Sequence, residues 1–392
     1  MNEYIERKIG AKDLEQELLK LVGEYNKLRQ TFMALFVTAM NKPIPDTALS
    51  HDDYYILHDL IGDAKSNSID IYLETPGGSG EAAEVIVKCL RSKFEKVSFT
   101  ISGEAKSAGT IMALSGDEIL MTETGSLGPI DAQVKIGRSV ISAYDYIEWT
   151  EKKRKEAEDK GKLSPFDATM VAQISPGELS GVNNSLKYAE ELVTEWLAKY
   201  KFKNWDRTET RQLEVTDEMK IKKANEIAAE LTNHAKWRTH GRSITANDLE
   251  EIGLRVTRLE KDKKLCEVVY RIQTVCRLLF SSTTTYKIFA TETSKVFKNA
   301  TPTASIQTIP GMNIPPQAIE VGELKVKCSK CGKVSEIYAK FVDNPKIDAD
   351  FQKKGSIAYP KDNKLKCDCG FEIDLSGIRN ELEVKVGKKI LA

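Results

Sequence analysis

The strongest constraint on the fold is a segment in which strands and helices alternate. Apolar runs that read as strands lie at residues 69–73, 97–101 and 118–121, and helical patterns lie between them at 81–93 and 110–114. Parallel strands need crossover connections, which are usually right-handed helices. The spacing therefore predicts an α/β domain built on a parallel sheet.

The whole sequence divides into four expected segments. We expect an N-terminal amphipathic helix over residues 1–30 and the main α/β domain over 31–298. A linker that contains four prolines follows over residues 299–322, and a β-rich tail occupies 323–392. The chain thus predicts one large domain and one small C-terminal domain.

Composition narrows the classes of function. The 392 residues hold 58 Lys and Arg against 58 Asp and Glu, so binding to nucleic acid or to an anionic membrane is not indicated. The sequence has no apolar run of 18 residues, no secretory leader pattern and no nucleotide-binding P-loop. The seven cysteines are unevenly placed, which favours a reducing compartment. These features predict a cytoplasmic protein with no membrane span and no nucleotide cofactor.

Two turns after predicted strands are the candidate site. Gly77 and Gly78 allow a ligand to approach the backbone, and Ser107 lies between a strand and a short helix. Ligands of open α/β sheets bind beyond the carboxyl ends of the strands. The Ser107 hydroxyl would lie at a helix N-terminus, where the amides of Gly78 and Ala108 can stabilise an oxyanion. The alternative is an ordinary N-cap serine and an ordinary glycine turn.

Three motifs in order carry a family resemblance. They are Glu74-Thr75-Pro76-Gly77-Gly78-Ser79, Glu104-Ala105-Lys106-Ser107-Ala108-Gly109-Thr110 and Thr124-Gly125-Ser126-Leu127-Gly128-Pro129-Ile130-Asp131. Together they resemble the Clp-fold serine peptidases, and within them the serine dehydrogenase proteinase family, relatives of signal peptide peptidase A. The segments His240-Gly241-Arg242 and 250–254 resemble that family's closing part, so the resemblance covers roughly residues 30–290.

The resemblance implies the fold, the activity and the roles of three residues. It implies the crotonase-like ββα superhelix, assembly into a homo-oligomer, and a serine endopeptidase that acts on a protein or peptide substrate. Ser107 would be the nucleophile that forms an acyl-enzyme, and Gly78 and Ala108 would form the oxyanion hole. Two alternatives remain: a non-catalytic Clp-fold scaffold, and an acyl-CoA enzyme of the crotonase fold.

The general base is the open part of this assignment. Clp-type peptidases place a histidine about 25 residues after the serine, but this chain has Asp131 there. Relatives of signal peptide peptidase A use a lysine, which in bacterial members lies a few residues before a Ser-Pro-Phe stretch. Here Lys160 and Lys162 precede Ser164-Pro165-Phe166, so the resemblance makes Lys160 the candidate base and Lys162 its alternative.

The sequence leaves other candidates for the general base open. Lys160 and Lys162 lie in a charged run that is typical of a solvated helix face. Lys106 is adjacent to Ser107, but we expect its side chain to point away. Asp131 as an acid and His240 as a base are further options.

Four cysteines in the tail predict a metal site. Cys328 and Cys331 form a C-x₂-C pair, and Cys367 and Cys369 form a C-x-C pair, each followed by glycine. Four thiolates suit a structural Zn²⁺, one per chain, and leave no open coordination position. The arrangement resembles a zinc ribbon, from which the C-x-C pair departs. The alternative is disulfides or free thiols, and the domain's expected role is to bind a substrate, a partner or a neighbouring subunit.

Overall fold

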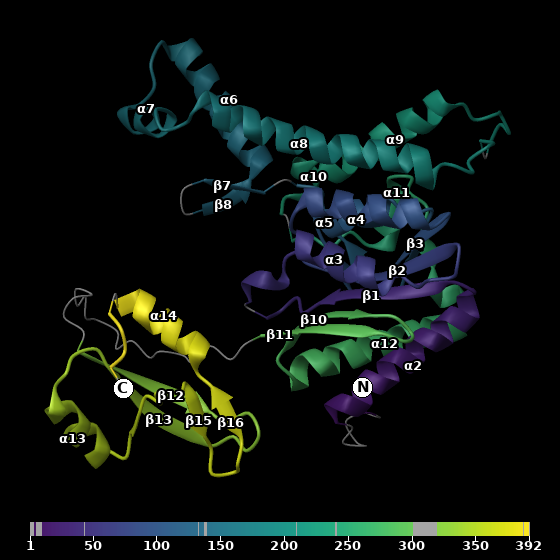
Figure 1. Ribbon diagram of the computed structural model, residues 1–392. Helices are drawn as coiled ribbons and strands as arrows, with labels where there is room; N and C mark the ends of the chain where they lie inside the picture. Colours follow the sequence, from purple (N-terminus) through teal and green to yellow (C-terminus); the bar gives the residue numbers. More distant parts are fainter. Residues whose placement is uncertain are drawn as a thin grey trace. The chain divides into compact units, whose positions relative to one another are not determined.

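The structure is a computed structural model that describes residue 4 and residues 10–42, 44–131, 133–136, 139–208, 210–239, 241–300, 320–386 and 388–391. The chain forms two compact units, Met1–Ala300 and Thr301–Ala392 (Figure 1). Most of the predicted linker, residues 301–319, lies outside the described residues, as does His240. Among the described residues, no helix combines the length and apolar character that crossing a bilayer requires.

A seven-stranded sheet forms the centre of the first unit, in the order β11-β10-β1-β2-β3-β5-β9. Its strands are β1 (Phe32–Thr38), β2 (Ser68–Glu74), β3 (Lys96–Ile101), β5 (Glu118–Met121), β9 (Thr257–Arg258), β10 (Thr285–Ala290) and β11 (Lys295–Asn299). The strands from β1 to β9 in this order pair in parallel, whereas β10 and β11 form an antiparallel hairpin on the β1 edge. The predicted α/β class is confirmed.

Helices cover both faces of this sheet (Figure 1). One face carries α2 (Ala11–Arg29) and α12 (Lys263–Ser282), and the other carries α3 (His51–Leu60), α4 (Gly80–Lys93) and α5 (Ala108–Leu114). Successive residues of β1 alternate between the two faces: Ala34 and Phe36 join one apolar cluster, and Met33, Leu35 and Val37 join the other. The sheet is therefore buried on both sides, as expected when helices form its crossovers.

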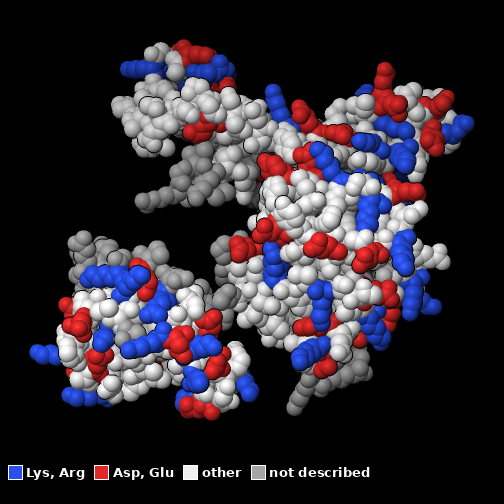
Figure 2. Space-filling view, in the orientation of Figure 1, with Lys and Arg blue, Asp and Glu red and all other residues white. Residues whose placement is uncertain are grey.

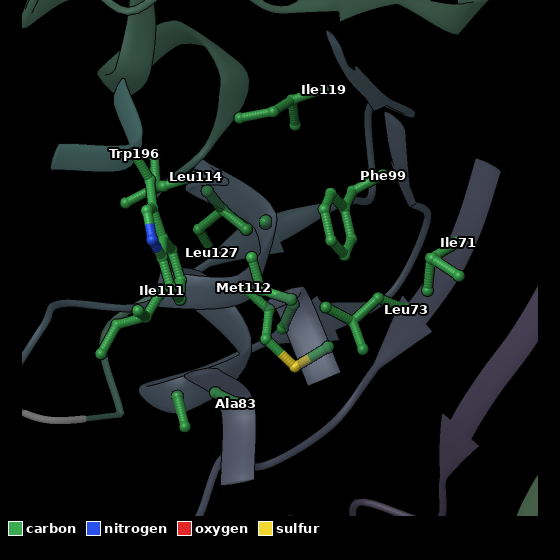
Figure 3. Packing of buried hydrophobic residues seen from close by; sticks show 14 of the residues in the cluster. Ile71, Leu73, Ala83, Phe99, Ile111, Met112, Leu114, Ile119, Leu127 and Trp196 are labelled. Carbon is green, nitrogen blue, oxygen red and sulfur yellow. The ribbon is translucent and has the colours of Figure 1, made fainter. Parts of the chain in front are cut away.

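Further helices extend the unit beyond α4 and α5. These are α6 (Ala143–Lys160), α7 (Pro165–Val171), α8 (Pro176–Trp196), which continues into a π-helical turn at Leu197–Lys201, α9 (Asp217–Thr232), α10 (His234–Trp237) and α11 (Ala246–Glu251). Trp196 of α8 packs into the same cluster as Leu73 of β2 and Met112 of α5 (Figure 3). This packing fixes α8 over the end of the sheet where β2 and β3 lead into their helices.

Short elements complete the first unit. They are the 3-10 helices Pro45–Thr47 and Leu259–Lys261, the paired strands β4 (Glu104–Ala105) and β6 (Ser126–Leu127), and the hairpin β7 (Gln133–Ile136) and β8 (Ser139–Ser142). Strand β4 ends just before Ser107 in the chain and pairs with β6, so this pair helps to position that residue.

The second unit is small and rich in strands. It contains β12 (Val321–Lys327), β13 (Val334–Lys340), β14 (Ile357–Ala358), β15 (Lys364–Lys366), β16 (Glu372–Asp374), α13 (Pro345–Lys353) and α14 (Ser376–Val386). Its main apolar cluster includes Leu324, Ile337, Tyr359 and Leu375. Figure 2 shows positive and negative side chains interspersed over the visible face of each unit. The predicted β-rich C-terminal region is confirmed.

Candidate active site

Ser107 has a strained backbone at the start of α5. Its φ of 49° and ψ of −118° lie outside the regions that non-glycine residues favour, and its side chain makes no capping hydrogen bond. The turn is held by the Gly109 amide, which donates to the Lys106 carbonyl at 2.8 Å, and by the Thr110 hydroxyl, which donates to the Ala105 carbonyl at 2.8 Å. Ser107 is therefore not an ordinary N-cap, and strain of this kind is typical of functional sites.

Gly77 packs directly against this turn. Its φ is +93°, and a Cβ there would lie 2.6 Å from the Ser107 Cβ and 2.7 Å from the Lys106 carbonyl oxygen. Both the backbone angle and the close approach require glycine at this position. The turn after β2 thus packs directly against the turn before α5.

Gly78 presents its amide to the same space. The Leu49 amide donates to the Gly77 carbonyl at 2.7 Å, and the Ser79 amide donates to the Leu49 carbonyl at 3.0 Å. In a parallel bridge these bonds flank the residue between them, so the Gly78 N–H points away from Leu49. The Ala108 N–H belongs to the first turn of α5, where helical amides have no intrahelical acceptor. Within the described ranges, neither amide donates to another group of the protein.

A cavity of about 680 Å³ joins these groups. Its lining comprises Thr47, Ala48, Pro76, Gly77, Gly78, Ser79, Gly80, Glu81, Ser107, Ala108, Ile111, Ile130, Asp131, Gln133, Asn184, Ser185, Tyr188 and Ala189. The residues from Asn184 onward belong to α8, which forms one wall. The structure therefore brings the predicted Ser107, Gly78 and Ala108 together around one half-enclosed space, with Ser107 partly exposed to it.

Comparison with known proteins agrees with this geometry. Residues 36–179 match the family of ClpP-like SDH-type serine proteinases. This part of the chain is a ClpP-like domain. The family resemblance predicted from the sequence is confirmed, and the matched ClpP-like segment includes Ser107 and both glycines of the cavity.

Two relatives that match about two thirds of this chain are themselves uncharacterized proteins. The uncharacterized protein MJ1495 of Methanocaldococcus jannaschii is 27% identical over 246 residues, which cover 61% of this chain and 70% of that protein. The uncharacterized protein MJ0137 of the same organism is 26% identical over 281 residues, 67% of this chain and 80% of that protein. A solved mutant of the 1510-N membrane-bound stomatin-specific protease covers 56% of this chain and 79% of its own chain, with 15% identity and a TM-score of 0.33.

The two predicted base lysines do not line the cavity of the ClpP-like domain. Lys160 is the last residue of α6, its side chain is 67% exposed, and its ammonium lies 2.9 Å from Glu156. Lys162 is exposed two residues later. A lysine base therefore stays a prediction.

Two other residues near Ser107 have clear positions. Lys106 points away, as predicted, because its ammonium lies 2.9 Å from the Ser243 hydroxyl and 3.3 Å from the Leu127 carbonyl. Burial lowers the pKa of Lys106. Asp131, by contrast, lines the cavity, and its carboxylate accepts a hydrogen bond from the Ser142 hydroxyl at 2.8 Å. Sequence reasoning named Asp131 only as an option, and it gave no signal for the α8 wall.

A buried acid lies directly before the glycine turn. Glu74 ends β2, is 1% exposed, and accepts a hydrogen bond from Arg277 of α12. Burial raises the pKa of Glu74 from its ordinary 4.5 to about 7, against the opposing effect of the Arg277 guanidinium. The strand end that positions Gly77 and Gly78 thus depends on a carboxyl group that is only partly ionised near neutral pH.

Glu74→Gln is expected to remove a pH dependence of stability. Because the pKa of Glu74 in the folded protein, about 7, lies above its ordinary 4.5, the folded state binds more protons than the unfolded state between these values. Stability therefore falls as pH rises through this window, by on the order of 3 kcal/mol, and levels off above it. Urea unfolding of both proteins from pH 4.5 to 8 measures the difference. Parallel curves would contradict the assignment, and the exposed Glu158→Gln serves as control.

The four tail cysteines form one cluster in the second unit. The sulfurs of Cys328 and Cys369 lie 3.7 Å apart, those of Cys331 and Cys367 lie 3.5 Å apart, and all four lie within 4.8 Å of one another. A tetrahedron with Zn–S bonds of about 2.3 Å has S···S edges of about 3.8 Å. The disulfide alternative does not hold in this structure, since all four are free thiols. The four cysteines therefore fit a tetrahedral metal ion.

The backbone around the cysteines supports the same interpretation. Gly332 and Gly370, one after each pair, have φ of +77° and +79°, which close tight turns around the thiols. The backbone amide of Cys331 lowers the pKa of the Cys328 thiol to about 6. Against the lowering effect of the Cys369 amide, burial and the hydrogen bonds shared with the other three thiols raise the pKa of Cys367 to about 12.

Proposed function

We propose that this protein is a serine endopeptidase that hydrolyses peptide bonds through an acyl-enzyme on Ser107. The observation that carries the proposal is the strained Ser107, which faces a cavity together with two amides that donate to no acceptor in the part of the chain that the structure describes. A hydroxyl beside an oxyanion site is the arrangement that acyl transfer needs. The match to ClpP-like serine proteinases supports this reaction over the alternatives.

The reaction follows from the positions of these groups. The Ser107 oxygen attacks the substrate carbonyl carbon while a base removes the hydroxyl proton. The amides of Gly78 and Ala108 donate to the oxygen that becomes negatively charged. The tetrahedral intermediate then releases the amine, which takes the proton, and water hydrolyses the ester on Ser107 in the same way.

For the base, the proposal keeps a lysine, Lys160 or its alternative Lys162. Either ammonium would have to leave its exposed position, lose its proton and reach Ser107. A strong drop in kcat for Lys160→Ala or Lys162→Ala, with a shifted pH profile and unchanged melting temperature, would support that residue. Unchanged kcat in both variants would remove the lysines as candidates.

The second unit is proposed to hold one structural Zn²⁺ in the cluster formed by Cys328, Cys331, Cys367 and Cys369. With four thiolate ligands such a site has no open position, so the metal would stabilise the unit and take no part in hydrolysis. We further propose that this unit binds a substrate, a partner protein or a neighbouring subunit, and that the protein is a cytoplasmic homo-oligomer.

A fluorophosphonate probe tests the proposed function directly. The native protein is expected to be labelled on Ser107, with labelling lost in Ser107→Ala and kept in the matched Ser92→Ala variant of α4. Mass spectrometry of the labelled peptide identifies the serine. A folded protein that stays unlabelled would favour the hypothesis of a non-catalytic scaffold. Retention of coenzyme A through purification would favour an acyl-CoA enzyme.

A further inference from the structure

The direction of the Gly78 amide is set by one neighbouring segment, residues 48–50. Gly78 forms a parallel bridge with Leu49, and a Cβ on Gly78 would lie 2.5 Å from the Leu49 nitrogen. The Leu49 amide and carbonyl bond to Gly77 and Ser79, the residues on either side of Gly78. The 48–50 segment therefore decides where the Gly78 N–H points, and with it one half of the proposed oxyanion hole.

A buried lysine and a buried aspartate hold this segment at both ends. The Lys287 ammonium donates to the Ala48 carbonyl at 2.7 Å, and the Ser50 amide donates to the Asp53 carboxylate at 2.9 Å. The two charged groups also meet each other, with the Lys287 nitrogen 2.9 Å and 2.7 Å from the two Asp53 oxygens. Their side chains are 1% and 0% exposed. Leu49 thus lies between two contacts that end on one ion pair.

The ion pair is anchored in regular parts of the first unit. Lys287 lies in β10, which pairs with β1 and β11 inside the central sheet. Asp53 lies in the first turn of α3, where its carboxylate completes the capping box with Ser50. A second cation, Lys298 of β11, lies 3.7 Å from Asp53 and is more exposed than Lys287. The sheet and α3 therefore position the 48–50 segment through Lys287 and Asp53.

This ion pair supplies contacts that an apolar pair could not. Taking two charges out of water costs free energy that apolar side chains of similar size would not cost. Apolar side chains, however, offer no donor to the Ala48 carbonyl and no acceptor to the Ser50 amide. Because Thr47 and Ala48 line the Ser107 cavity, Lys287 contacts the backbone of the cavity wall itself.

We propose that Lys287 and Asp53 are positioning residues, which clamp the 48–50 segment and so aim the Gly78 amide at the oxyanion beside Ser107. This inference rests on the proposed function. Lys287 and Asp53 lie outside the cavity lining, so they would act on the reaction only through Gly78. An oxyanion donor works only within hydrogen-bond distance of the developing charge, so a small shift of Gly78 would slow the reaction in a protein that stays folded.

Three variants separate positioning from stability. Lys287→Met replaces the ammonium with an uncharged group of similar length and leaves the buried Asp53 charge without it. Lys287→Met combined with Asp53→Leu removes both charges and should recover most of the lost stability, but it restores neither contact of the 48–50 segment. Arg29→Met is the matched control, because it removes a cation 3.1 Å from the buried Asp70 of β2 and lies outside the cavity lining.

The rate constant for labelling Ser107 with the fluorophosphonate measures the effect, since the phosphoryl oxygen takes the place of the oxyanion. At a temperature where every variant is folded, Lys287→Met is expected to lower this rate constant at least about tenfold. The double variant should melt closer to the wild type than Lys287→Met and still react at least about tenfold more slowly than the wild type. Arg29→Met should react within about twofold of the wild type, although its melting temperature falls.

The phosphorus-31 chemical shift of the labelled serine gives a second readout, because it responds to the hydrogen bonds on the phosphoryl oxygen. The shift is expected to differ from the wild type in Lys287→Met and in the double variant. It should be unchanged in Arg29→Met. A loss of stability alone would leave it the same in all four proteins.

The results distinguish the positioning role from the proposed function. A folded wild type that stays unlabelled overturns the peptidase proposal itself. If the wild type is labelled and the double variant reacts equally fast, the ion pair serves stability alone and the positioning role is wrong. An equal loss of rate in Arg29→Met would overturn the positioning role as well, because the rate would then follow stability. If Lys287→Met does not fold, the double variant decides the question through its rate and its chemical shift.

Discussion

Ser107→Ala is expected to reduce peptide hydrolysis by at least about a thousandfold while the protein stays folded. Alanine keeps the Cβ that packs against Gly77 and adopts the same φ of 49°, so the turn loses only its hydroxyl. Without that oxygen no acyl-enzyme forms, and the two amides can stabilise only attack by water. Release of soluble peptides from a fluorescently labelled unfolded protein measures the loss.

Two comparisons make this result specific. Ser92→Ala removes a hydroxyl from α4, where the Ser92 side chain donates to the Cys89 carbonyl of the same helix, and should keep full activity. The melting temperature of Ser107→Ala should match that of the wild type. Retention of more than a tenth of the activity in Ser107→Ala would show that another group performs the attack.

The alternating part of the fold could be predicted from sequence because its signals are local. The predicted strand at residues 69–73 is β2 (Ser68–Glu74), and the predicted strand at 118–121 is β5 with the same bounds. Each run is mostly apolar because helices cover both faces of the strand.

The β10–β11 hairpin was missed for a physical reason. Lys287 lies in the centre of β10 and breaks an otherwise apolar run, yet it is 1% exposed. Its ammonium lies 2.7 Å from the Asp53 carboxylate of α3, which compensates the buried charge. An ion pair between residues so far apart in sequence cannot be predicted from either residue alone.

The candidate site likewise has a part that the sequence predicts and a part that it does not. Ser107, Gly78 and Ala108 lie in turns directly after strands, so topology alone brings them together. The α8 wall with Tyr188 depends on how a long helical segment folds back over α4 and α5, which local patterns do not specify. The same non-local packing decides whether any lysine reaches Ser107, so motif spacing could suggest Lys160 but could not position it.

Removal of metal from the full chain is expected to unfold the second unit and leave the first folded. The main apolar cluster of the second unit is small, so its core alone supplies little stability. A structural Zn²⁺ bound by thiolates contributes on the order of 10 kcal/mol to the folding of small domains. Hydrogen exchange before and after chelation measures this as a loss of protection in β12 and β13 with protection kept in β1, β2 and β3.

Metal analysis and two cysteine variants decide what the cluster contributes to the stability of the second unit. The purified protein should contain about one zinc ion per chain, because four thiolates complete one tetrahedral site. Cys367→Ser should lose both the metal and the protection of β12 and β13, whereas Cys89→Ser in α4 should lose neither. Protection that survives chelation would mean that the small core suffices by itself. The four thiols would then be ligands that the fold brings together without depending on them.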